Sequence, residues 1–156
     1  MVAGRAGHWT NLLRERWRRT MPDVLDRIVF ARRLRDHDFL NLIALADVML
    51  DTVHFNGMNT SLEAFAVGTP VVTLRAAFQR GRHTQAMYCR MGLDDLIAHD
   101  AQAYIEQAVR LANDASHRDE VSNRILSANH ALFEDANVIR EFERYFVTAV
   151  LGNAAS

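Results

Sequence analysis

The chain has 156 residues, of which 49% are hydrophobic and 24% are charged, and its formal net charge is -1. This length suits one domain, or one half of a larger enzyme, and the near-zero charge gives nucleic acid no electrostatic advantage as a partner. All 18 basic residues are arginines, which excludes a lysine Schiff base or a lysine phosphate clamp within this chain.

Cysteine content and hydropathy indicate the compartment. The only cysteine, Cys89, excludes an internal disulfide and a cysteine-based zinc site. No apolar run approaches the roughly 20 residues that cross a membrane, and the first residues lack the apolar core of a signal peptide. We therefore expect a soluble, cytoplasmic protein without a membrane or nucleic-acid partner.

Two helices and a strand are predicted in the first third of the chain. Thr10 caps a helix that runs to about Arg19, and Pro22 ends that region. The apolar run Arg27–Ala31 (RIVFA) is typical of a buried strand. Asp36 or Asp38 then caps a second helix, whose apolar residues are expected to face inward: Phe39, Leu40, Ile43, Ala44 and Ala46.

Strands and helices alternate through the middle of the chain. Apolar runs predict strands at Val48–Leu50, Val71–Leu74 and Leu96–Ala98. Helical spacing predicts helices at Thr60–Val67, which Gly68 is well placed to end, and at His83–Met91. Three more helices follow from about Ala101 to Val150, with breaks near Ser116 and at Asp135–Asn137.

This order predicts an α/β fold: a Rossmann-like parallel sheet with helices on both faces and a helical C-terminal tail. We expect residues 1–156 to form one domain, with an α/β core at about 24–100 and helices at 101–150. Such sheets bind ligands beyond the carboxyl ends of their strands, which directs attention to the loops Arg32–Asp36, Asp51–Thr60 and Arg75–Arg82.

The loop that follows the second predicted strand has the features of a phosphate site. Gly57 would let the backbone approach a ligand or adopt positive φ, and Asn59, Thr60 and Ser61 supply uncharged donors. Free N–H groups in the first turn of a helix bind phosphate. An ordinary helix cap with a tight turn explains the same residues, and the pattern leaves both interpretations open.

Glu63 is expected within the first turn of that helix. Its carboxylate could accept two hydrogen bonds from vicinal hydroxyls such as those of ribose. A glutamate there could equally interact with the positive end of the helix dipole, and spacing does not distinguish these two roles.

Two stretches resemble a known family. SLEAFAVGTPVV (Ser61–Val72) looks like the nucleotide-sugar signature of GT-B glycosyltransferases: a glutamate, a short helix, Gly-x-Pro and an apolar strand. The wider run from Arg27 to Leu74 resembles bacterial SPINDLY-like proteins, which are relatives of O-GlcNAc transferase. With the later segments MYCRMGLDDLIAHDAQAYIEQAVRLANDASHRDEV and LFEDANVIREFERYF, the resemblance covers roughly residues 9 to 146.

The resemblance implies the C-terminal, UDP-sugar-binding lobe of an inverting protein O-glycosyltransferase with a UDP-GlcNAc-type donor and no metal or other cofactor. It gives roles to individual positions. Glu63 would bind the ribose, and the diphosphate would be held at Gly57, Met58 (by its backbone), Asn59, Thr60 and Ser61. The uracil would lie at Arg33, Leu34 and Phe39.

Arginines gather in the third loop, RAAFQRGRH. Arg82 is the strongest candidate for a donor-phosphate contact, because its planar fork suits phosphate oxygens, and His54 is a weaker one. The alternative is a solvated loop in which Arg82 forms a structural ion pair.

The rest of a GT-B enzyme is expected to be absent. In that family the acceptor lobe precedes the donor lobe, yet only about 26 residues precede the first predicted strand. We expect the helical repeats, the acceptor lobe and the first strand of the donor lobe to be absent. The resemblance puts the catalytic lysine in the missing part, so no catalytic residue is expected here. We expect a fragment that binds UDP weakly and does not transfer sugar alone. The sheet edge left open where the first strand of the donor lobe is missing could support a homodimer.

Two other functions remain open on the sequence. One is a GT-B-like sugar-nucleotide epimerase lobe, whose acid/base carboxylates would lie mostly in the missing part. The other is a non-enzymatic, flavodoxin-like interaction domain, for which Asp51 is the only candidate phospho-acceptor.

Overall fold

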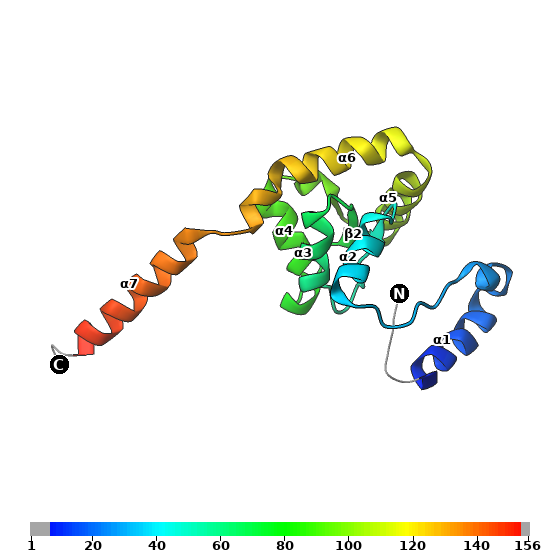
Figure 1. Cartoon of the computed structure of the whole chain (residues 1–156), viewed down its shortest axis with the longest axis horizontal. Coiled ribbons are helices and arrows are strands. Elements are labelled where there is room, and N and C mark those ends of the chain that lie inside the picture. The colour runs from blue at the N-terminus through cyan, green and yellow to red at the C-terminus, as the bar shows by residue number, and fades with distance from the viewer. Residues whose placement is uncertain (1–6, 154–156) are drawn as a thin grey trace. The chain divides into compact units, whose positions relative to one another are not determined.

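The computed structural model describes residues 7–153 (Figure 1). The chain divides into two compact units, one up to Leu42 and one from Ile43 onward. Each unit is described below by itself.

The first unit contains α1 (Gly7–Thr20), the 3-10 helix Pro22–Arg27 and most of α2 (Asp36–Ala44). The predicted strand at Arg27–Ala31 is wrong: the chain after Arg27 is extended but not paired with another strand among the described residues. A strand needs the hydrogen bonds of a neighbour. Phe30 instead packs on α1, where its ring lies 5.4 Å from that of Trp17 and 4.7 Å from the guanidinium of Arg14.

The predicted helix α2 is confirmed, but its inward face is narrower than expected. Ile43 is its only buried residue, Phe39 and Leu40 are half-buried, and Ala44 and Ala46 are exposed. The alanines carry too little apolar surface to require burial.

The second unit contains a parallel sheet, as predicted. Its strands are β1 (Met49–Leu50), β2 (Val71–Leu74) and β3 (Ile97–Ala98), in the order β1-β2-β3. The connecting helices α3 (Asn59–Ala66) and α4 (His83–Met91) lie on one face, because parallel crossovers are right-handed. The carboxyl ends of β1 and β2 therefore meet at one edge of the sheet, where the loops after them begin.

Gly68 ends α3, as predicted. Its φ of +79° is left-handed, and the chain turns through hydrogen bonds from Gly68 N to Phe65 O (3.3 Å) and from Thr69 N to Ala64 O (2.9 Å). A Cβ at Gly68 would lie 2.8 Å from the Cγ of Leu126, so glycine also lets α3 approach α6 (Ala115–Ala128).

Tyr88 closes the core beneath the sheet. Its hydroxyl accepts a hydrogen bond from Val71 N and donates one to Val71 O, each of 3.0 Å. β3 pairs only with Thr73 and Leu74, so these backbone groups of Val71 would otherwise be buried without partners. Burial raises the pKa of Tyr88, which keeps the phenol neutral, and its ring packs edge-on against Phe65 with centroids 4.8 Å apart.

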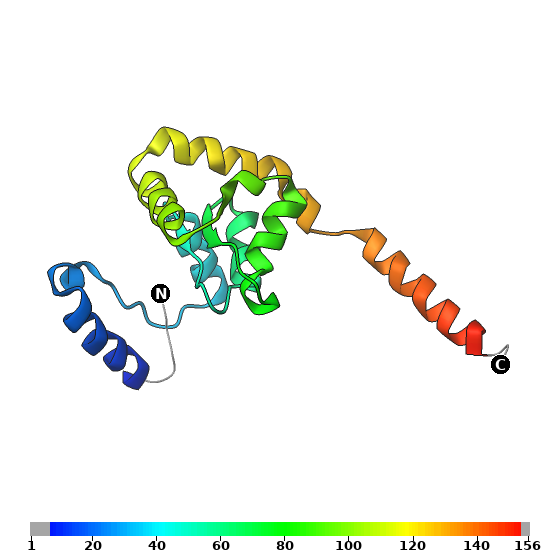
Figure 2. The same cartoon turned by 180° about the vertical axis from the view of Figure 1, so that it is seen from behind.

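The three predicted C-terminal helices are confirmed as α5 (Ala101–Asn113), α6 and α7 (Ala136–Asn153) (Figure 2). The first break falls at Asp114, whose carboxylate caps α6 by accepting from His117 N at 3.0 Å. No helix in the described part of the chain has the length and apolar content to cross a membrane.

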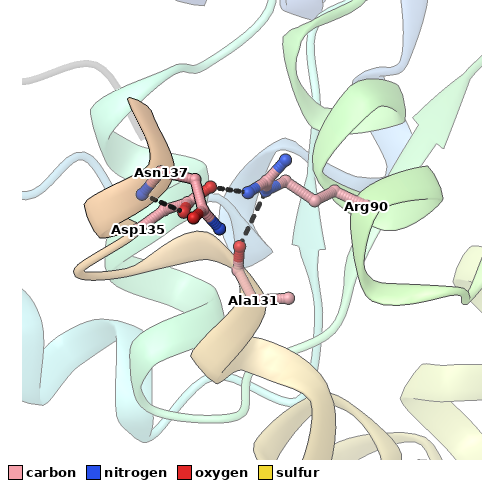
Figure 3. A network of polar contacts seen from close by, with 4 residues as sticks. All are labelled: Arg90, Ala131, Asp135 and Asn137. Atoms are coloured by element: carbon pink, nitrogen blue, oxygen red, sulfur yellow. Dashed lines mark hydrogen bonds and ion pairs between the residues drawn. The ribbon is translucent and has the colours of Figure 1, made fainter. Parts of the chain in front are cut away.

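Arg90 joins α4 to the start of α7 (Figure 3). Its Nε donates to Ala131 O at 2.8 Å, and its terminal nitrogen forms an ion pair with Asp135. The other carboxylate oxygen of Asp135 accepts from Asn137 N at 3.0 Å, which caps the first turn of α7.

Candidate functional site

The loop between β1 and α3 is organised by Asp51, which is 6% exposed. Its Oδ1 accepts from Gly57 N at 2.9 Å. Its Oδ2 accepts from Thr73 Oγ1 at 2.9 Å and from the side-chain amide of Asn56. Asp51 therefore ties the loop to β2, and Tyr104 OH adds a 2.8 Å hydrogen bond to the Asp51 carbonyl.

The carbonyl of Gly57 is held from the opposite side. It accepts from Ser61 Oγ at 3.2 Å and from Thr84 Oγ1 at 3.5 Å, and these two hydroxyls lie 2.8 Å apart. Ser61 is completely buried, so its hydroxyl serves the turn and does not reach a ligand. Gly57 does not adopt the positive φ that the sequence left open; a Cβ there would lie 3.1 Å from Ser61 Oγ.

The N-terminus of α3 has no side-chain cap. Met58 is the N-cap residue, and no side chain accepts a hydrogen bond from the first amides among the described residues. Asn59 is exposed and Thr60 half-buried beside those amides. This turn therefore lacks the ordinary side-chain cap that was the alternative interpretation of the sequence. The partial positive charge of the helix end remains available to an anion.

Glu63 lies farther along α3 than predicted. It is the fifth residue of the helix, and the first turn holds no acidic residue. The influence of the helix dipole fades beyond the first turn, so the dipole gives little reason for a carboxylate here. The side chain is half-buried, and it forms no ion pair within the described part of the chain.

Hydrogen bonds fasten the third loop, Arg75–Arg82, to the second, Asp51–Thr60. Asn56 N donates to Arg80 O at 2.8 Å, and Arg80 Nε donates to His54 O at 3.2 Å. Gly81 permits this contact, since a Cβ there would lie 3.2 Å from Val53 O and 2.9 Å from the Cβ of Ala76. Arg80, one of the arginines of the third loop, thus holds the two loops together.

Arg82 and His54 both have exposed side chains at this edge of the sheet. No carboxylate lies within 4.0 Å of Arg82 across residues 7–153, so the predicted alternative of a structural ion pair is not observed. The guanidinium is free to meet an external anion.

The structure brings the diphosphate and ribose candidates together on one loop and one helix of the second unit. Arg33, Leu34 and Phe39 belong to the first unit, where Arg33 is exposed and the other two are half-buried. None of these predicted residues lines the cavity of about 490 Å³ near Pro70 and His99. The described residues include no cluster of three His, Cys, Asp or Glu side chains that could hold a metal ion.

Sequence reasoning missed the supporting role of Asp51, Thr73 and Thr84. Asp51 was considered only as a phospho-acceptor, and both its oxygens are occupied and buried, which removes that chemistry. The available signal was an aspartate directly after a buried strand, a position where a carboxylate can organise the following loop.

Comparisons with known proteins agree with this architecture. A family model described as glycosyl transferase family 41 matches residues 10–140. A probable UDP-N-acetylglucosamine-peptide N-acetylglucosaminyltransferase SPINDLY of Solanum lycopersicum is 28% identical over 115 residues, which are 72% of this chain and 12% of that protein. A UDP-N-acetylglucosamine-peptide N-acetylglucosaminyltransferase of Caenorhabditis elegans is 35% identical over 91 residues, 58% of this chain and 8% of that protein.

A solved structure also matches. A mutant O-GlcNAc transferase of Thermobaculum terrenum superposes with a TM-score of 0.73 at 26% identity, over 86% of this chain and 27% of its own. The chain thus spans about a tenth of the length of the curated relatives and about a quarter of the solved one.

Proposed function

Since the chain belongs to glycosyl transferase family 41, we propose that it is the nucleotide-sugar-binding lobe of an inverting protein O-glycosyltransferase with a UDP-GlcNAc-type donor. The observation that carries the proposal is the uncapped start of α3, which lies at the carboxyl edge of a parallel sheet. Ligands bind at this edge in open α/β sheets. The names of the relatives supply the donor class.

The diphosphate would lie against the first turn of α3. The backbone of Met58 and the side chains of Asn59 and Thr60 would form the cradle, and helix amides with a positive partial charge favour an anion there. Gly57, whose N–H and C=O are both bonded inside the protein, and the buried Ser61 would shape the turn behind it. The guanidinium of Arg82, which is exposed and forms no ion pair among residues 7–153, and the imidazole of His54 would be further phosphate donors from these two loops.

The nucleoside would be held by two further groups of residues. Glu63, one turn along α3, would accept hydrogen bonds from both ribose hydroxyls. The family resemblance assigns the uracil to Arg33, Leu34 and Phe39, with Phe39 offering a ring on which a base can stack.

In the chemical step a serine or threonine hydroxyl of the acceptor attacks the anomeric carbon, and the bond from that carbon to the UDP oxygen breaks. Negative charge then develops on the leaving diphosphate. The α3 amides and Arg82 would stabilise this charge because they are already oriented before the reaction. No metal is required in this scheme.

We propose that these 156 residues bind UDP but do not transfer sugar alone, because the acceptor and the attacking hydroxyl need a second lobe. The proposal includes a cytoplasmic location, a protein acceptor and the absence of a nucleic-acid or membrane partner. It also includes a homodimer through the outer edge of β1, which pairs with no other strand among the described residues. Light scattering after gel filtration measures the oligomeric state.

Calorimetry with UDP tests the proposed site. We expect the wild type to bind UDP and Glu63→Ala to bind about tenfold more weakly, because one charged hydrogen-bond acceptor is lost. Glu120→Ala, an exposed glutamate on α6, is the control and should match the wild type. 2′-Deoxy-UDP should bind the wild type more weakly than UDP does, but show no such difference with Glu63→Ala.

Two results would contradict the proposal at different levels. Equal UDP affinities of the wild type and Glu63→Ala would remove the ribose assignment alone. Absence of UDP binding by the wild type would remove the function itself.

A further inference from the structure

The backbone of Gly57, at the candidate site, is held on both sides of its Cα. The N–H of Gly57 donates to Asp51 Oδ1 at 2.9 Å. Its C=O accepts from Ser61 at 3.2 Å and from Thr84 at 3.5 Å. Both groups are therefore used inside the protein, which fixes the orientation of the chain where it enters α3.

The hydrogen-bond partners come from every element around the turn. Asp51 follows β1, Thr73 lies in β2, Ser61 in α3 and Thr84 in α4. The first amides of α3 directly follow the fixed backbone of Gly57 and have no intrahelical acceptors. Their direction is thus set by side chains that themselves face the core.

We propose that Asp51 is a positioning residue for the nucleotide: its carboxylate fixes the N–H of Gly57 and thereby aims the first turn of α3 at the diphosphate. This inference rests on the proposed function. Asp51 itself does not reach a ligand, because it is 6% exposed and both oxygens already accept hydrogen bonds.

The position requires a carboxylate. Three donors converge on its two oxygens: Gly57 N–H, the Thr73 hydroxyl and the Asn56 amide. An asparagine would turn an NH₂ toward one of these donors. Asn56 also reflects this demand, since its amide nitrogen serves Asp51 and Thr52 O while its own Oδ1 is buried without a partner among the described residues.

A purely structural role would look different in solution. If Asp51 only stabilised the fold, weakening its hydrogen bonds would lower the melting temperature while the folded molecules bound UDP unchanged. If it positions the turn, the affinity of folded molecules falls as well, because preorganised amides become mobile.

Substitutions at Thr73 separate the two roles with little change in shape. Thr73→Val removes the hydroxyl that donates to Asp51, and Thr73→Ser keeps it. Thr69→Val is the matched control: Thr69 is also buried, and its hydroxyl donates at the same 2.9 Å, but to the carbonyl of Ile43, away from the site. The complete chain is titrated with UDP by calorimetry at a temperature at which every variant is folded.

We expect both valine variants to lower the melting temperature, but only Thr73→Val to weaken UDP binding, by about tenfold. Thr73→Ser should restore most of the affinity. Amide exchange followed by NMR gives a second readout without ligand: the Gly57 amide should exchange about tenfold faster in Thr73→Val than in Thr69→Val.

UDP affinity of Thr73→Val within twofold of the wild type would overturn the positioning role and leave the proposed function standing. So would equal Gly57 exchange rates in the two valine variants. A wild type that does not bind UDP would overturn both the proposed function and this inference.

Discussion

Replacing Gly68 by alanine measures how closely α3 must approach α6. The backbone at Gly68 has φ +79°, a conformation that costs an alanine about 1 kcal/mol or somewhat more. The new Cβ would also lie 2.8 Å from both Leu126 Cγ and Ser122 Oγ. Overpacking of this kind typically costs about 1–3 kcal/mol. The free energy of unfolding should therefore fall by about 2–4 kcal/mol.

Gly92→Ala is a matched control for the backbone effect. Its φ is +70°, yet a Cβ there would meet no atom within 4 Å. This variant should lose only the backbone contribution of about 1 kcal/mol. Equilibrium unfolding in urea, followed by circular dichroism, measures both variants against the wild type. Equal losses for the two alanines would refute the reasoning, because they would show that α6 moves aside without cost.

Three further substitutions test the core, an ion pair and a helix start. Tyr88→Phe should cost about 1–3 kcal/mol in the same urea assay, because both backbone groups of Val71 lose their partner; a loss below about 0.5 kcal/mol would contradict this role. The hydrogen bond from Arg124 lowers the pKa of the Asp95 carboxyl, so the pair stabilises the protein above the ordinary aspartate pKa of about 3.9 and loses this effect as the pH falls through the lowered value. Arg124→Gln should raise the Asp95 pKa in an NMR titration, with a stability loss of at most about 1 kcal/mol at neutral pH because the pair is exposed; an unchanged pKa would show that the pair does not form in solution. Asp135→Ala should cost about 1 kcal/mol and speed amide exchange in the first turn of α7, and unchanged exchange there would argue against the cap.

Local signals in the sequence predicted the elements around the site closely. Val71–Leu74 and His83–Met91 have the predicted bounds, and α3 differs by one residue at each end. A short apolar run and a glycine after a helical pattern are properties of neighbouring residues, so they can be read without knowledge of the fold. The family resemblance is likewise confirmed by the match to residues 10–140.

Prediction failed where an element depends on a distant partner. The run RIVFA has the composition of a strand, but a strand exists only through hydrogen bonds to another strand, and none is formed with it in the described part of the chain. The predicted burial of Ala44 and Ala46 was wrong for a related reason. Periodicity indicates which face of a helix is apolar, but the neighbouring elements decide how much of that face is buried.

The sequence by itself determined the local part of the candidate site: a glycine turn, Asn59 and Thr60 at a helix start, and a glutamate one turn later. The tertiary structure decided which side chains support that turn. Asp51 bonds Thr73, which is 22 residues away in the sequence, and Ser61 bonds Thr84, which is 23 residues away. These side chains bond to one another and to Gly57, and none of them caps the first amides of α3. Spacing along the chain cannot reveal such pairs, because the parallel sheet alone brings the end of β1, the middle of β2 and the start of α4 to the same place.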